Sequence, residues 1–218
     1  MIVVVGLPAY ADSPDCEGCA GGLAVEVAAA AKRRGGAVEL VGKIGDDGAG
    51  DAVVVALGRL GVGHAALLRD PARPTPVLAA EAADDDAAEL DAAVPEARLL
   101  PESAESRPAL EAADVELALR YLPQAGVIVL ADPLPESAVA AGAEGADFAA
   151  ARLIVLVPAG LTPPPLPAAA TVLEAPAHDD GSFGRLVGIF AGALDAGVEP
   201  AAAFKEAVAA SGWEAIAD

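Results

Sequence analysis

The sequence predicts an α/β fold: a three-layer αβα sandwich in which helices cover both faces of a mostly parallel sheet. Short runs that are apolar throughout alternate along the chain with longer helical segments, and such strands are typical of parallel sheets buried on both faces. Aromatic residues make up 3% of the 218 residues, so the core must be aliphatic and closely packed. The length suits one domain, residues 1–218.

The first half of the chain begins with the apolar run "IVVV" at residues 2–5, which predicts a strand that ends at Gly6. A helix is expected over residues 21–34, because its last turn is basic and the two glycines Gly35 and Gly36 follow. "AVELVG" predicts the second strand, and a second helix is expected over residues 49–60. "HAALLRD" and "TPVLAAEA" are candidate strands.

The second half continues the alternation after an acidic, irregular stretch at residues 84–108. We expect a helix at "ALEAADVELALRYL", a buried strand at "VIVLAD", a helix at "PESAVAAGAEGADFAAA" and a buried strand at "RLIVLVP". Two helices are expected at residues 183–196 and 200–210. The central strands should be "IVVV", "AVELV", "VIVLA" and "RLIVLV", and ligands in such sheets bind at the carboxyl ends of the strands.

The formal charge of −20 limits the classes of partner. An acidic chain repels the phosphates of nucleic acids and anionic lipid headgroups, so neither nucleic acid nor a membrane is an expected partner. No segment reaches the roughly 18 consecutive apolar residues of a membrane span. The first residues also lack the basic start of a signal peptide. We therefore expect a cytoplasmic protein.

One long stretch, residues 21–63, has an ordered set of motifs. It contains a Gly-Gly pair that opens a helix, a strand, a G-K-x-G-D-D-x-x-G turn, and a second helix that ends in L-G-V. This order and spacing resemble the N-terminal signature of the PfkB family, the ribokinase-like sugar and nucleoside kinases. The resemblance implies a ribokinase-like sandwich and an ATP-dependent transfer of phosphate to a sugar or nucleoside, with ATP and Mg²⁺ as cofactors if the chain is active.

The resemblance also implies where a substrate would bind. The site would lie near the Gly-Gly pair and the G-D-D turn, and the candidate substrate-binding residues are Asp12, Gly21, Gly22, Glu26 and Asp47. Asp12 is included because the family has an Asp near the end of its first strand, although its offset from Gly6 differs. We expect the ligand to be a small hydroxylated or phosphorylated molecule.

A second stretch, "HDDGSFGRLVGIFAGAL" at residues 178–194, occupies the place of the family signature D-T-x-G-A-G-D. In that signature the glycines and the helix N-terminus hold phosphate, and the final Asp accepts the proton of the substrate hydroxyl. Aligning the first glycines assigns anion binding to Gly181, Ser182 and Gly184, and puts Gly184 in the place of the base. Asp179 or Asp180 would be the catalytic base in a shifted register; otherwise they cap the helix.

Other departures from the family pattern concern the substrate, the metal and the lid. Glu26 stands where the family has an Asn that contacts the sugar. The chain contains no Asn, so the family's N-x-x-E element, which helps to organise magnesium, is missing. The segment at residues 6–20 is short for the family's β-lid, and we expect that lid to be reduced or absent.

The same segment contains both cysteines, Cys16 and Cys19, at C-x-x-C spacing. Two ordinary thiols or an incidental disulfide are the first expectation. A redox pair or half of a zinc site is the alternative. The two histidines are far away in sequence, so no metal site is assigned.

Three functions agree with these observations. The first is a catalytically impaired relative of the sugar kinases that still binds a small ligand. The second is an active ATP-dependent kinase that uses Asp180 or Asp179 as its base. The third is a homodimeric scaffold that binds no ligand.

Overall fold

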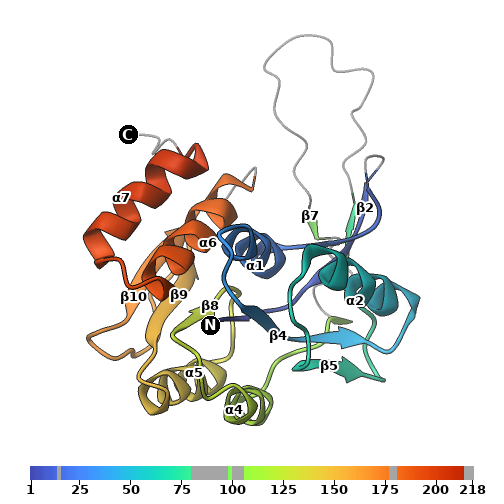
Figure 1. The fold of residues 1–218 in the computed structure, drawn as a ribbon. Coiled ribbons are helices and arrows are strands. Elements are labelled where there is room, and N and C mark those ends of the chain that lie inside the picture. Colours follow the sequence, from blue (N-terminus) through green and yellow to red (C-terminus); the bar gives the residue numbers. More distant parts are fainter. Residues whose placement is uncertain (14–15, 80–97, 100–105, 177–180, 214–218) are drawn as a thin grey trace.

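The computed structural model describes residues 1–13, 16–79, 98–99, 106–176 and 181–213 (Figure 1). Its main sheet has the strand order β10-β9-β8-β1-β4-β5, and each neighbouring pair is parallel. The strands are β1 (Ile2–Val5), β4 (Val38–Gly45), β5 (Leu67–Asp70), β8 (Val127–Leu130), β9 (Arg152–Pro158) and β10 (Thr171–Ala175). The parallel sheet and its four central strands are confirmed.

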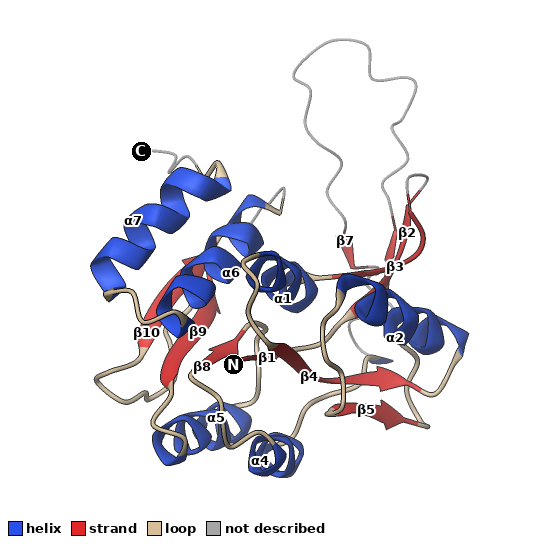
Figure 2. Cartoon of the chain, viewed as in Figure 1, coloured by secondary structure: helices blue, strands red, loops and turns tan. Residues whose placement is uncertain are grey.

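Helices cover both faces of this sheet (Figure 2). On one side lie α1 (Leu23–Arg33), α2 (Gly48–Leu60), α6 (Ser182–Asp195) and α7 (Pro200–Ser211); on the other lie α4 (Ala112–Tyr121) and α5 (Glu136–Phe148). Alternate residues of β1 point to opposite faces. Ile2 and Val4 pack in the cluster that contains α1 and α6, whereas Val3 and Val5 pack with α4 and α5. The three-layer αβα sandwich is therefore confirmed.

Helices α1 and α6 approach each other closely through small residues. A Cβ placed on Gly188 of α6 would lie 2.5 Å from the Cβ of Ala30 and 2.5 Å from the carbonyl oxygen of Val27, both on α1. Only glycine leaves room for this approach. The N-termini of the two helices are consequently held together.

A second, smaller sheet has the order β3-β2-β6-β7. Its strands are β2 (Ala9–Ser13), β3 (Cys16–Gly21), β6 (Val77–Ala79) and β7 (Arg98–Leu99). The segment at residues 6–20, where we expected a reduced or absent lid, contributes β2 and most of β3 to this sheet. Sequence analysis assigned no strand to the antiparallel pair β2 and β3, because the proline, glycines and acids of this stretch are typical of turns. Cys19, in β3, is disulfide-bonded.

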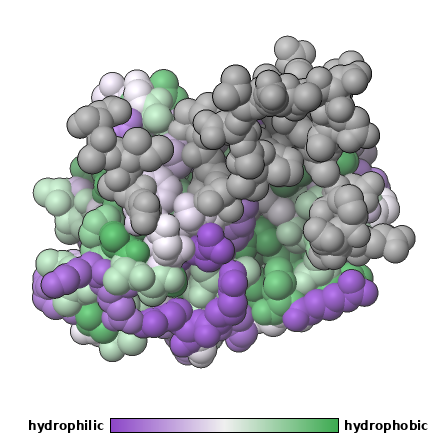
Figure 3. Space-filling model, turned by 90° about the horizontal axis from the view of Figure 1, so that it is seen from above, coloured by the Kyte–Doolittle hydropathy of each residue, from purple (hydrophilic) through white to green (hydrophobic). Residues whose placement is uncertain are grey.

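The surface of the described residues is mixed in polarity. In the view from above, hydrophilic residues gather along one edge, with hydrophobic and neutral ones beside them (Figure 3). Among the helices within the described ranges, none has both the length and the apolar character that crossing a bilayer requires.

Candidate ligand-binding site

The candidate site lies at the carboxyl edge of the main sheet. The chain leaves β1 at Gly6 and Leu7, and it leaves β8 just before Asp132. Because these strands are parallel neighbours, their following residues meet at one edge, which is where ligands bind in open α/β sheets.

Asp132 is held at this edge by the chain after β1. The backbone N–H of Leu7 donates to Asp132 Oδ2 at 2.6 Å, and a Cβ on Gly6 would collide with the same oxygen. Burial raises the pKa of Asp132 to about 6, although the Leu7 N–H and the Arg107 charge act to lower it. Sequence analysis took this residue only as the end of a strand; an acid directly after an apolar run was the available signal.

The raised pKa predicts how stability responds to Asp132→Asn. Between pH 4 and pH 6 the folded chain keeps a proton that the unfolded chain has released, so the free energy of unfolding falls as pH rises. The amide oxygen can still accept from Leu7, and partial exposure limits the effect. We expect the variant to be more stable than the wild type by about 2 kcal/mol at pH 7 and by much less at pH 4.

Urea unfolding at the two pH values measures this difference. Asp147→Asn is the matched control, since Asp147 is exposed on α5, and it should change stability equally at both pH values. An equal change for Asp132→Asn at both pH values would contradict the raised pKa.

Glu26 and Gly184 lie against each other although 158 positions separate them in the chain. A Cβ built on Gly184 would be 2.6 Å from Glu26 Oε2 and 2.7 Å from Glu26 Cβ. One built on Gly181 would be 3.8 Å from the same oxygen. The Glu26 carboxylate therefore takes the space that a side chain at position 184 would use, beside the first turn of α6.

The start of α6 contains the predicted anion-binding residues. Gly181 precedes the helix with φ 81°, a conformation that favours glycine, and its carbonyl accepts from the N–H of Arg185 at 3.2 Å. Ser182 is the first helical residue, and Phe183 is buried. Weak anion binding here stays a prediction. Asp179 and Asp180, the candidate bases, lie outside the described residues.

Asp47 holds a turn together with both of its carboxylate oxygens. Oδ1 accepts from the N–H of Gly50 at 2.8 Å and from the Thr75 hydroxyl at 2.7 Å, while Oδ2 accepts from the Thr75 N–H at 2.8 Å. Burial alone would raise the pKa of Asp47, but these hydrogen bonds outweigh it and hold the pKa below its ordinary value. These bonds assign Asp47 a role in the turn, and substrate contact by it stays a prediction.

The other predicted substrate-binding residues lie at the start of α1 and in the small sheet. Gly22, with φ 95°, precedes α1, and its carbonyl accepts from the N–H groups of Val25 and Glu26. A Cβ on Gly21 would lie 2.7 Å from Leu78 Cδ1, so Gly21 has a packing role. Asp12 pairs through its backbone in β2, but its side chain is outside the described part of the structure.

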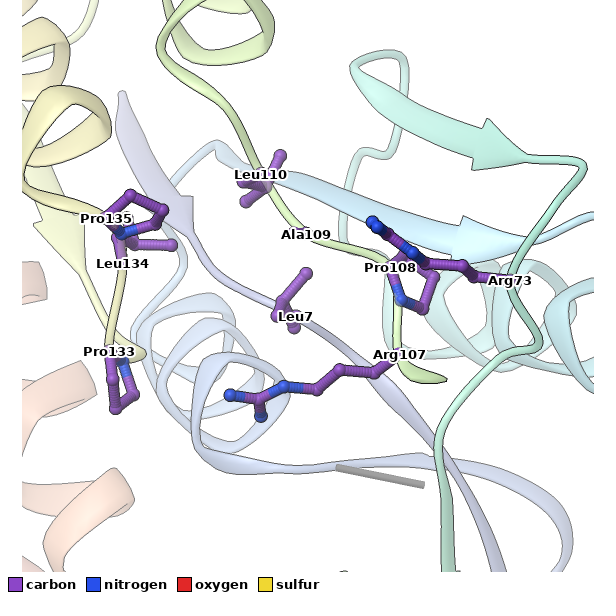
Figure 4. A pocket seen from close by; sticks show the side chains of 9 residues that line it. All are labelled: Leu7, Arg73, Arg107, Pro108, Ala109, Leu110, Pro133, Leu134 and Pro135. Atoms are coloured by element: carbon purple, nitrogen blue, oxygen red, sulfur yellow. The ribbon is translucent and has the colours of Figure 1, made fainter. Parts of the chain in front are cut away.

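A cavity of about 360 Å³ opens at the same edge of the sheet (Figure 4). Its lining is Leu7, Arg73, Arg107, Pro108, Ala109, Leu110, Pro133, Leu134 and Pro135. The volume is in the range of small-molecule sites. Sequence analysis did not predict this lining, because its residues come from four separate loops.

The structure thus brings some predicted residues together and not others. Gly22 precedes α1, Glu26 lies on it, and the Glu26 carboxylate is beside Gly184. Asp47 belongs to the turn that fixes Thr75, in the loop that carries Arg73. Asp132 and the two arginines were not predicted.

A family model described as pfkB family carbohydrate kinase matches residues 13–176. No curated protein sequence matches the chain significantly.

Solved structures with the same fold include several kinases. A ribokinase from Arabidopsis thaliana, complexed with ribose and ATP, has a TM-score of 0.67 and 17% identity over 96% of this chain and 90% of that chain. A PfkB protein from Polaromonas sp. JS666 has a TM-score of 0.68 and 12% identity over 96% of this chain and 94% of that one. A putative ribokinase II from E. coli, in complex with ATP and Mg²⁺, has a TM-score of 0.62 and 13% identity, with coverages of 96% and 91%.

Proposed function

We propose that this chain, which belongs to the pfkB family of carbohydrate kinases, binds a small hydroxylated or phosphorylated ligand at the carboxyl edge of its sheet and transfers phosphate weakly or not at all. The observation that carries the proposal is the position of the Glu26 carboxylate beside Gly184. The cavity at the same edge supports the binding half of the proposal.

The start of α6 does not fit a nucleotide phosphate. The dipole of a helix N-terminus in general favours an anion. In this chain an anion of the protein itself, the Glu26 carboxylate, already lies beside Gly184 and Gly181. A phosphate at the same place would face a like charge at short range, which is unfavourable in a partly buried site.

The general base that the family resemblance leads one to expect on α6 is also missing from its usual position. Gly184, in the place of the family's base, has no side chain, and general-base help is worth about 10²- to 10⁴-fold in rate. In the described ranges, no three His, Cys, Asp or Glu side chains gather as a possible metal site, and the chain has no Asn. The part of the chain that the structure describes therefore offers no cluster of three such side chains for magnesium, and the proposal includes no step that needs the metal.

The catalytic half is tested by ATP turnover with magnesium and a panel of sugars and nucleosides. We expect turnover at background, because neither the base nor the phosphate position is available. Magnesium-dependent phosphorylation that Asp180→Ala abolishes would overturn the proposal in favour of the displaced base. If Glu26→Gln abolished it instead, Glu26 would be the base.

The binding half is tested by thermal unfolding with the same panel. A ligand present at 100 times its Kd adds about 2.7 kcal/mol to the free energy of unfolding, so binding should raise the Tm. If no sugar, nucleoside or phosphorylated compound shifts the Tm, the binding half fails. A dimer measured by light scattering in that case would favour the scaffold function.

A further inference from the structure

The outer face of helices α4 and α5 exposes large apolar side chains to water. Tyr121 and Phe148 are 77% and 82% exposed, the largest fractions among the large hydrophobic residues that the structure describes, and Leu117 is 48% exposed. The whole chain has only four Phe, two Tyr and one Trp. Because aromatic side chains are enriched where proteins bind one another, the exposure of two of these few indicates a binding surface.

The two aromatic side chains lie at the same end of the helix pair. Helix α4 ends at Tyr121, shortly before β8, and α5 ends at Phe148, shortly before β9. Since β8 and β9 are parallel neighbours, the C-termini of both helices lie at the same end of the sheet. The helices pack on each other, side by side in Figure 1. Tyr121 and Phe148 therefore make one end of this face apolar.

A groove of about 560 Å³ lies between the two helices. Where the helices meet, a Cβ on Gly145 of α5 would collide with Leu119 Cδ1 of α4. Glu116 lines the groove about one turn from Leu119 toward the N-terminus of α4, whereas Arg120 and Phe148 line it on the side of the C-termini. The groove thus has an acid toward one end and a base with an aromatic ring toward the other.

The charged side chains of the groove are not engaged in ion pairs within the described residues. Glu116 and Arg120 are exposed one turn apart on α4, and Glu144 is exposed on α5. None of the three takes part in the salt bridges that the described ranges contain. Their charges are therefore available to a partner.

The arrangement of these charges matches a second copy of this chain better than another class of partner. A uniformly basic partner would meet Arg120, and a uniformly acidic one would meet Glu116 and Glu144. A two-fold axis through the groove turns the second copy end for end, so that Arg120 of each copy faces Glu116 of the other and the pair forms twice. The aromatic end of each copy then covers the far end of the other groove.

We infer that the α4–α5 face, meaning the groove together with Leu117 and Tyr121, is the interface of a symmetric homodimer. It lies on the opposite side of the main sheet from α1 and α6. The inference therefore goes beyond the proposed function and holds whether or not a ligand binds. The 13 residues of α5 span about 20 Å, so the interface is small and the dimer should be weak.

Sedimentation velocity of the whole chain tests the inference, in about 0.15 M salt so that the long-range repulsion between two acidic copies is screened. We expect a change from monomer to dimer between about 1 and about 200 µM, because small interfaces give weak complexes. Phe148→Ser and Arg120→Glu should each weaken the dimer about tenfold or more. The swap of Arg120→Glu with Glu116→Arg should restore it, because every pair across the two-fold axis is then reversed but kept.

Two variants on the other side of the sheet are the matched controls. Val55→Ser and Arg59→Glu change exposed residues of α2, and both should leave the dimer unchanged. Circular dichroism establishes that each variant is folded. A chain that stays monomeric over the whole range overturns the inference and leaves the face to a partner of another kind. A dimer that neither Phe148→Ser nor Arg120→Glu weakens also overturns it, since the interface then lies elsewhere, and a swap that restores nothing overturns the two-fold pairing.

Discussion

Gly184→Asp, made alone, is expected to destabilise the chain by about 3 kcal/mol, at the upper end of the usual cost of overpacking. The new Cβ would lie 2.7 Å from Glu26 Cβ, which cannot move without shifting α1, and 2.6 Å from Glu26 Oε2. The new carboxylate would also meet a like charge. Urea unfolding of the variant measures the loss.

The reciprocal exchange, Glu26→Gly with Gly184→Asp, should recover most of this stability. It keeps one carboxylate in the space between α1 and α6, with one methylene fewer, and it adds the cost of a helical glycine at position 26, about 1 kcal/mol. A double-mutant cycle then gives a large coupling energy between the two positions. If Gly184→Asp is as stable as the wild type, the Glu26 carboxylate does not fill that space.

The exchange also tests the proposed function, because it places the carboxylate on α6, where the family has its base. If the doubly substituted chain turns over ATP faster than the wild type, then phosphate transfer in the wild type is limited by the lack of a carboxylate at position 184. Glu26→Gly alone is the control: it removes the carboxylate without providing a base, so it should stay at background.

The sequence predicted the main sheet well because each strand is signalled by its own residues. Apolar runs such as "IVVV" and "VIVLAD" are long enough to define buried strands, and the glycines around residues 35 and 61 mark the ends of the helices before the next strands. In the small sheet, β6 lies within the predicted strand "TPVLAAEA", but its pairing with β2 was missed because the two strands are distant in the chain. Strand β2 pairs with β6, about 67 positions away, and no local pattern in "AYADS" requires this.

The candidate site was predicted only in part for the same reason. Sequence analysis identified Glu26 and Gly184 as two separate departures from the family pattern, an acid gained on one helix and an acid missing on another. Their contact is a property of the α1–α6 packing and could not be seen in either motif. Arg73, Arg107 and Asp132 fall outside the motifs altogether, and only the folding of their loops brings them to one edge of the sheet.

The close packing of α1 on α6 also predicts that Gly188→Ala strongly destabilises the chain. A Cβ at this position would lie 2.5 Å from the carbonyl oxygen of Val27 and 2.8 Å from the nitrogen of Ala31, both backbone atoms of α1. The backbone atoms of a helix cannot rotate out of the way as a side chain can, so the two helices must separate. We expect the free energy of unfolding to fall by about 3 kcal/mol.

Gly58→Ala is the matched control for this substitution. Gly58 is also inside a helix, α2, but a Cβ there would meet nothing closer than His64 Cε1 at 3.9 Å. Alanine is the better helix former by about 1 kcal/mol, so this variant should be more stable than the wild type. Urea midpoints measured together should therefore move in opposite directions. Equal stability of the Gly188→Ala variant and the wild type would mean that α1 and α6 are not held together by this contact, and the pairing of Glu26 with Gly184 would lose its structural basis.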